Sequence, residues 1–220
     1  LGVDAPAAGY ALTSLAGYLA LSQAEGGSRE PEVLPPSALR LPTSWSCPHG
    51  VARWDDGCSC TPGDSSWKLP LRWALRRLAT RLDAIFEAES ASALRHPWLA
   101  LESYLDLRDG AVAPASYWSV HAQRKLRTAD ALRLGGLLEM QFMRQAMFVS
   151  CAWFFDDLDR LEPRIALAHA HRAITLAARH SGADLGPGFA ADLAASRSAR
   201  TGRSAADIYH EFAQAVADVA

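Results

Sequence analysis

The residues with the clearest chemical potential lie in one short segment of the chain. Cys47 and His49 are separated by one residue, and Cys58 and Cys60 repeat that spacing further along. Thiolate and imidazole are preferred zinc donors, so these four side chains are candidate ligands of one tetrahedral ion. Cys151 is a further candidate ligand, from a distant part of the sequence.

Two other roles remain open for these cysteines. Paired ligands in small zinc sites are usually separated by two or more residues, because a single intervening residue makes it harder for both side chains to reach one metal. The cysteines could instead form a disulfide, or stay free and pack as small apolar side chains beside a cleft. We therefore expect Cys47, Cys58 and Cys60 to converge in space, with their chemistry left undecided.

A second segment combines aromatic and acidic side chains. Trp153 is followed by two phenylalanines and then by Asp156 and Asp157. A sugar site typically offers an indole face for the pyranose ring and carboxylates that accept hydrogen bonds from its hydroxyl groups. The same residues would also suit the end of a helix that has aromatic core residues and acidic caps.

Glu139 lies in the most apolar stretch of the chain. A buried carboxylate either needs a cationic partner or has a raised pKa. Arg72 or Arg76 could supply that partner, which would make Glu139 structural rather than functional.

These candidate residues must be held by helices, because apolar residues recur at helical spacing with almost no β-branched alternation. The pattern predicts an all-α bundle around a central apolar helix over residues 128–150. Other helices are expected over residues 8–22, from Trp67 onward, after Pro97, over 159–180 and over 205–219. Residues 1–42 are expected to form an N-terminal helix and a linker, and residues 43–220 one helical domain with an irregular Cys/His/Trp-rich loop over 43–66.

Composition excludes several classes of partner. The formal net charge is -2, so nothing indicates nucleic acid or an anionic membrane as a partner. No apolar stretch has the length and flanks of a membrane span or a signal peptide, which predicts a cytoplasmic protein. Motifs for phosphate loops, dinucleotide binding, zinc proteases and serine hydrolases do not occur.

Segments along nearly the whole chain resemble those of a known family. The matching segments are residues 43–54, 58–60, 97–104, 138–141, 150–157 and 207–209. In this order they are similar to domain of unknown function 3536, a helical region that follows the catalytic barrel in some glycoside hydrolase family 57 proteins. Pro42 and Pro48 depart from the family pattern.

The resemblance implies a bacterial, cytoplasmic, carbohydrate-active protein whose helical part contributes to an α-glucan cleft. Its catalytic carboxylates would belong to an upstream barrel, so this chain alone is expected to hydrolyse nothing. Adjacent Asp156 and Asp157 would not serve as the catalytic pair, because consecutive helical side chains diverge. The residues expected to bind a maltooligosaccharide are Trp45, His49, Trp54, Glu139, Trp153, Asp156 and Asp157. All of them except Glu139 are expected to face one shared cleft.

A second class of function stays open beside this one. The chain could be a zinc-stabilised helical module for binding or assembly, without chemistry of its own. Zinc bound without affinity for oligosaccharide would favour this alternative.

Overall fold

The computed structural model describes residues 4–24, 37–38, 41, 43–44, 47–60 and 63–217. The contacts divide the chain into two units, Leu1–Leu41 and Pro42–Ala220. The first unit contains α1 (Asp4–Ala7) and α2 (Leu15–Ala24). The helix expected over residues 8–22 thus begins later, at Leu15. The Ser14 hydroxyl accepts a hydrogen bond from the Gly17 amide and so caps the start of this helix. Most of the expected linker, 25–42, lies outside the described residues.

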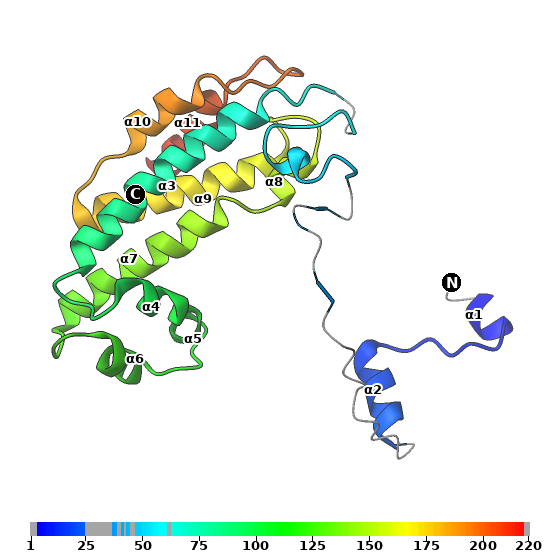
Figure 1. Ribbon diagram of the computed structural model, residues 1–220, viewed down its shortest axis with the longest axis horizontal. Coiled ribbons are helices and arrows are strands. Elements are labelled where there is room, and N and C mark those ends of the chain that lie inside the picture. Colours follow the sequence, from blue (N-terminus) through cyan, green and yellow to red (C-terminus); the bar gives the residue numbers. More distant parts are fainter. Residues whose placement is uncertain are drawn as a thin grey trace. The chain divides into compact units, whose positions relative to one another are not determined.

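The second unit is helical, which confirms the all-α prediction; in the described ranges its only β pairing is two isolated bridges. Figure 1 shows its helices. They are α3 (Lys68–Ser90), α4 (Pro97–Glu102), α5 (Tyr104–Arg108), α6 (Pro114–His121), α7 (Thr128–Ala146), α8 (Cys151–Phe154), α9 (Leu161–Ser181), α10 (Gly186–Leu193) and α11 (Ala205–Ala217), with a 3-10 turn, η1 (Ala52–Trp54), before them.

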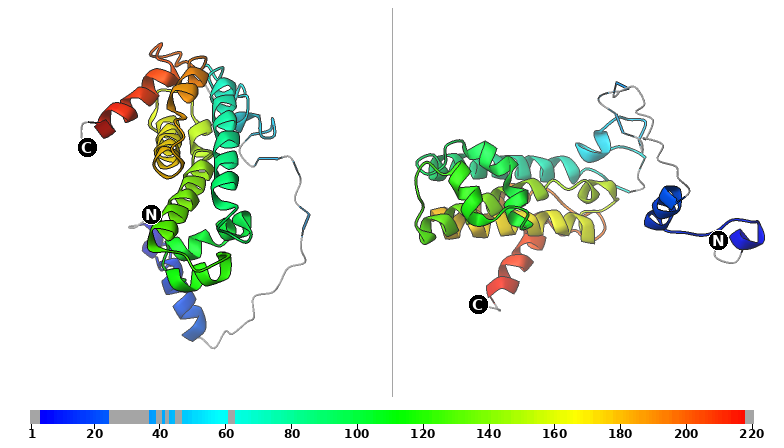
Figure 2. Two further views of the ribbon diagram at one scale, coloured as in Figure 1. Left: turned by 90° about the vertical axis from the view of Figure 1, so that its left-hand side faces the viewer. Right: turned by 90° about the horizontal axis from the view of Figure 1, so that it is seen from below.

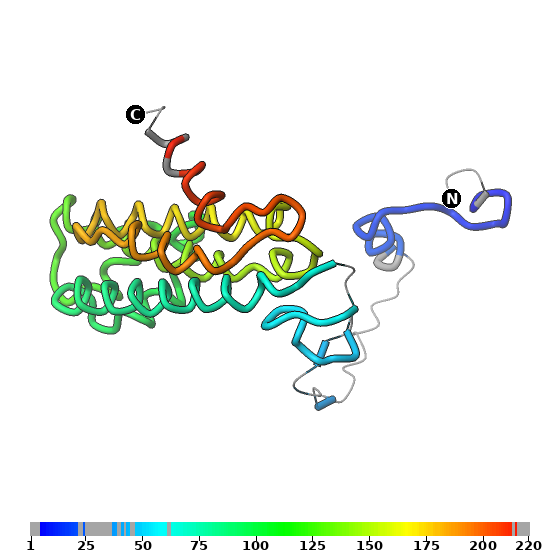
Figure 3. Tube along the Cα trace, turned by 90° about the horizontal axis from the view of Figure 1, so that it is seen from above, coloured from blue at the N-terminus to red at the C-terminus, as the bar shows by residue number. Residues whose placement is uncertain are grey.

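Three long helices form the core of this unit. Helices α3, α7 and α9 lie side by side, and α7 packs most extensively against α9 (Figure 2). Helix α3 buries one stripe of large apolar side chains at the predicted three- and four-residue spacing, namely Leu71, Leu75, Leu78, Leu82 and Phe86. Helix α10 packs against α3, and α11 contacts α9 and α10 and then leads away from the bundle (Figure 3).

The predicted central helix is shorter, and a smaller part of its surface is buried, than its sequence indicated. Helix α7 ends at Ala146, and residues 147–150 form a turn before α8. Leu132 on its outer face is 69% exposed, while Leu134, Leu137 and Leu138 are fully buried or nearly so. Helix α7 therefore shares the central position with α9 instead of being enclosed on all sides.

The ends of the last two long helices follow their sequence signals. Gly182 ends α9 in the left-handed conformation, at φ 76°, where a residue without a Cβ is preferred. At α11 the Ser204 hydroxyl accepts a hydrogen bond from the Asp207 amide at 3.1 Å, and the Asp207 carboxylate accepts one from the Ser204 amide at 2.8 Å. Ser204 thus caps this helix.

Candidate metal centre

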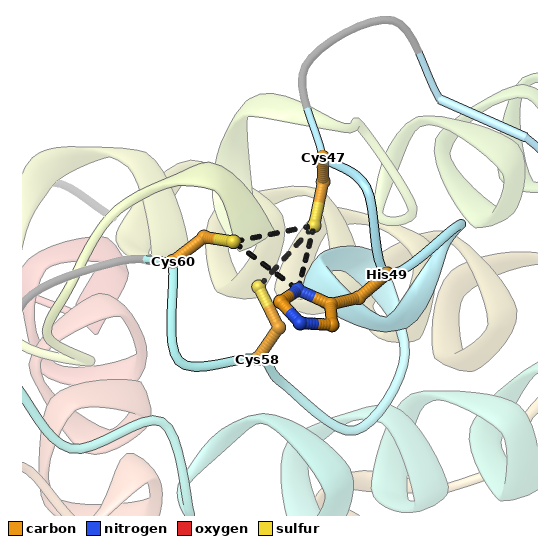
Figure 4. A group of neighbouring side chains, drawn as sticks. All are labelled: Cys47, His49, Cys58 and Cys60. Carbon is orange, nitrogen blue, oxygen red and sulfur yellow. Dashed lines mark hydrogen bonds between the residues drawn. The ribbon is translucent and has the colours of Figure 1, made fainter.

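The four predicted ligands of the cysteine loop converge in one cluster (Figure 4). One donor atom from each of Cys47, His49, Cys58 and Cys60 lies within 4.8 Å of all the others. The Cys47 Sγ is 3.5 Å from the Cys58 Sγ and 3.9 Å from the Cys60 Sγ. The Nδ1 of His49 faces the sulfur atoms, 3.7 Å from that of Cys47 and 3.2 Å from that of Cys60.

These separations match the edges of a zinc tetrahedron. With Zn–S bonds of ~2.3 Å and a Zn–N bond of ~2.0 Å, S–S edges measure about 3.8 Å and S–N edges about 3.6 Å. The observed S–S distances, 3.5 and 3.9 Å, lie on either side of the first value. The donor set is thus of the Cys₃His type found in structural zinc sites.

A tight turn brings the two ligand pairs together despite their one-residue spacing. The amides of Asp55 and Gly57 both donate hydrogen bonds to the Ala52 carbonyl, so the chain reverses between His49 and Cys58. Gly57 adopts φ +104°, and a Cβ there would lie 2.4 Å from the Ser65 hydroxyl oxygen. Only glycine fits this position, which directs Cys58 and Cys60 back toward Cys47.

All four cysteines are free, and their exposure differs. Cys47 is 4% exposed, whereas Cys60 and His49 are at the surface. Partial loss of hydration beside the other ligands raises the pKa of the Cys60 thiol, and the neighbouring Cys47 and Cys58 raise it further. Burial also raises the pKa of Cys58, but hydrogen bonds from Cys60, Cys47 and Arg53 lower it by more. Three thiolates at this distance repel one another, so a divalent cation between them would relieve the repulsion.

Two cationic side chains, those of Arg53 and Lys68, lie close to the thiols of the cluster. Neither was predicted from the sequence. Lys68 is fully buried, and its Nζ donates to the Arg53 carbonyl at 3.2 Å. Burial lowers the pKa of Lys68, whereas the nearby thiols of Cys58 and Cys47 favour its charged form. Lys68 stands three residues before Leu71, on the buried stripe of α3. That position is the signal that could have identified it, because a lysine on a core stripe needs a polar partner.

The loop is also attached to the helices around it. Asp55 forms ion pairs with Arg72 at 3.4 Å and Arg76 at 3.0 Å, both on α3. The Arg53 guanidinium lies over the Phe154 ring of α8, 4.7 Å from its centroid. Arg72 and Arg76 are therefore engaged by Asp55, and the arginine that pairs with Glu139 is Arg108 instead.

Cys151 does not join the cluster of described ligands. It is exposed at the start of α8, and the group of converging donors consists of the other three cysteines with His49. The predicted convergence of Cys47, Cys58 and Cys60 is confirmed by their distances, and the extension to Cys151 is not.

Trp153 lies in the core, as the helix-end alternative anticipated. Its side chain is 0% exposed, stacked on Trp67 at 6.2 Å between ring centroids and covered by the Arg72 guanidinium at 4.3 Å. The predicted stacking of Trp153 on a sugar therefore does not fit this structure, because the ring has no accessible face.

The two adjacent aspartates have different roles in the fold. Asp157 is 5% exposed, and its carboxylate accepts hydrogen bonds from the Ser198 hydroxyl at 2.8 Å and the Arg200 amide at 3.2 Å. It ties the end of α8 to the segment before α11, and its carboxylate oxygens are occupied by these hydrogen bonds. Asp156 is more exposed and pairs with Arg160 at 3.3 Å.

Two of the other predicted substrate-binding residues lie on different elements, Trp54 in η1 and Glu139 in α7. Trp54 is half-buried against the core, and Trp45 lies outside the described residues. Glu139 accepts a hydrogen bond from the Tyr104 hydroxyl at 2.8 Å and pairs with Arg108 at 3.2 Å. Trp153 and Asp157 are buried, so neither side chain offers an accessible surface to a ligand in this structure.

One family model matches most of the chain. It is described as domain of unknown function (DUF3536), and it covers residues 64–218. The chain belongs to this family. Nothing among curated proteins or solved structures matches it. The matched DUF3536 region includes every helix from α3 to α11, whereas the cysteine loop directly precedes it.

The described part of this DUF3536 protein holds no helix with the length and apolarity that crossing a membrane requires.

Proposed function

We propose that this chain is a zinc-stabilised helical module, in which Cys47, His49, Cys58 and Cys60 bind one Zn²⁺. The observation that carries the proposal is the mutual approach of four donor atoms within 4.8 Å. Three sulfur atoms and one imidazole nitrogen match zinc better than magnesium or calcium, which prefer oxygen ligands.

The role of the ion would be to fix the cysteine loop on the helical bundle. The loop contributes little to the core, since Val51 is 46% exposed and only Cys47 and Arg53 of its described residues are buried. A segment with so little buried apolar surface gains its order from ion pairs or a metal. With four protein ligands the zinc would keep no open position for substrate, which favours a structural over a catalytic ion.

The buried cations support this assignment. Three thiolates and a neutral imidazole around Zn²⁺ carry a net charge of about -1. Lys68 and Arg53 lie next to this charge and would balance it, which gives the buried ammonium of Lys68 a physical reason.

The first test is the metal content of the chain. Protein purified without chelator is expected to contain close to one equivalent of zinc by elemental analysis. A chelator should remove the zinc and lower the thermal midpoint, because the ion binds only the folded loop. Zinc well below one equivalent, after purification in zinc-supplemented buffer, would contradict the proposal.

A second candidate function is carbohydrate binding, and one pocket favours it. The pocket has a volume of about 350 Å³ and is lined by aromatic and polar side chains, including Trp98, Tyr104, Phe142, Glu102 and Gln145. Tyr104 also donates its hydroxyl to Glu139. Aromatic walls with a few polar groups are typical of sugar sites. On the family resemblance, the ligand would be an α-glucan and the partner an upstream catalytic barrel in a bacterial cytoplasm.

The glucan proposal predicts weak binding of maltooligosaccharides by this chain without hydrolysis. Trp98 is 40% exposed, so replacing it by alanine should remove the binding measured by calorimetry. Trp73→Ala is the matched control, since Trp73 is 49% exposed on α3 and does not line the pocket. Equal loss in both variants, or no binding at all, would refute this second candidate.

A further inference from the structure

A second pocket, far along the chain from the cysteine loop, combines an aromatic wall with basic side chains. It has a volume of about 480 Å³ and lies between α6 and the start of α7. Its lining includes Trp118 and Leu126 on the apolar side and Arg95, Arg124 and Lys125 on the charged side. Pockets of this size accommodate a small organic ligand.

The backbone around this basic pocket is held by several hydrogen bonds. The Arg95 amide donates to the His121 carbonyl at 2.9 Å, and the Gln123 amide donates to the Ala93 carbonyl at 2.9 Å. Leu94 and Ala122 form an isolated bridge between the same two segments. The Arg95 Nε donates to the Ala122 carbonyl at 2.9 Å, which leaves the two terminal guanidinium nitrogens for another acceptor. The site is therefore preformed and not assembled by a loose loop.

The charges of the basic pocket are largely unbalanced. Its lining residues in the described ranges include three cations and no carboxylate. Arg124 forms a long ion pair with Asp130, at 3.9 Å, whose carboxylate also accepts two hydrogen bonds from Arg127, at 3.0 and 3.1 Å. Within the part of the chain that the structure describes, Lys125 makes no ion pair. Three cations around one pocket attract an anionic ligand with several acceptor oxygens.

The apolar side limits which anion fits. Trp118 is half-buried and packs edge-on against Tyr117, 4.9 Å between ring centroids, so its indole is fixed in place. A free inorganic ion would leave this wall and much of the volume unused. A ligand with a ring would cover the indole, while its anionic group reaches the cations.

We propose that the basic pocket binds a phosphate monoester of a ring compound, with the ring against Trp118 and the phosphate held by Arg95, Arg124 and Lys125. The ring could be a sugar or a nucleoside base, because both stack on an indole. The proposal is independent of zinc and of the glucan site, since no residue of either lines this pocket.

Calorimetric titration of the whole chain tests the proposal. The probes are glucose 6-phosphate and AMP, each compared with inorganic phosphate and with its dephosphorylated counterpart, glucose or adenosine. At least one ester is expected to bind about tenfold or more tightly than both of its parts, and less tightly in high salt. The ester that binds identifies the ring as sugar or nucleoside.

Substitutions of residues that line the pocket then show where the ester binds. Arg124 and Lys125 are exposed, so Arg124→Ala and Lys125→Ala should fold normally. Each substitution should weaken binding of the ester by about tenfold. Trp118→Ala should weaken binding of the ester and leave the affinity for inorganic phosphate unchanged. The matched control is Arg172→Ala, which removes an exposed arginine of α9 that does not line the pocket. Absence of ester binding, ester binding no tighter than phosphate, or equal binding by the pocket variants and the control would overturn the proposal.

Discussion

Replacing Trp153 by alanine is expected to lower the free energy of unfolding by about 3–5 kcal/mol, the range for deleting a fully buried large aromatic side chain. Trp153 is 0% exposed, stacks on Trp67 and lies under the Arg72 guanidinium. Its removal opens a cavity and leaves Arg72 without its aromatic partner. Denaturant titration monitored by circular dichroism measures the loss.

The control for this variant is Trp73→Ala on α3. Trp73 is 49% exposed, so its replacement should change the free energy of unfolding by much less. If Trp153→Ala were as stable as Trp73→Ala, the indole would not be in the core. The hypothesis that Trp153 is a sugar platform would then regain its basis.

Replacing Cys47 by serine is expected to abolish stable zinc binding and to lower the thermal midpoint of the zinc-loaded protein. Cys47 is the most buried of the four ligands and the one from which distances to all three others are short, 3.5 to 3.9 Å. An ion present at 1,000 times its dissociation constant stabilises the fold by about 4 kcal/mol, and the variant loses that amount. Thermal unfolding with zinc and with chelator gives the difference.

Cys151→Ser is the matched control, because Cys151 is exposed and outside the cluster. The control should keep the full response to zinc, whereas Cys47→Ser should unfold at the same temperature with zinc and with chelator. An equal zinc response in the two variants would show that Cys47 is not a ligand.

The helices could be predicted from the sequence because their signals are local. The stripe from Leu71 to Phe86 has the spacing of a buried helix face, and Gly182 marks the end of α9. The end of α7 could not be predicted from the sequence, because the turn after Ala146 depends on how α8 packs on α9 and η1.

The candidate metal centre was predictable in its residues but not in its geometry. Clustered cysteines and a histidine indicated convergence, yet their one-residue spacing argued against a shared metal. The donor atoms of Cys47 and His49 nevertheless lie 3.7 Å apart, and the turn at Gly57, with φ +104°, brings the second pair to the first. A backbone angle of this kind cannot be derived from the spacing of ligands. Trp153 and Asp157 are buried in the fold, which their residue types alone could not show, because the same types suit a core and a sugar site equally well.

X-ray absorption at the zinc edge of the purified chain tests the account most directly, because it reports the ligands of the ion themselves. We expect one zinc with three sulfur neighbours at ~2.3 Å and one nitrogen neighbour at ~2.0 Å. A first shell of nitrogen and oxygen atoms alone, or a spectrum that Cys47→Ser leaves unchanged, would contradict it.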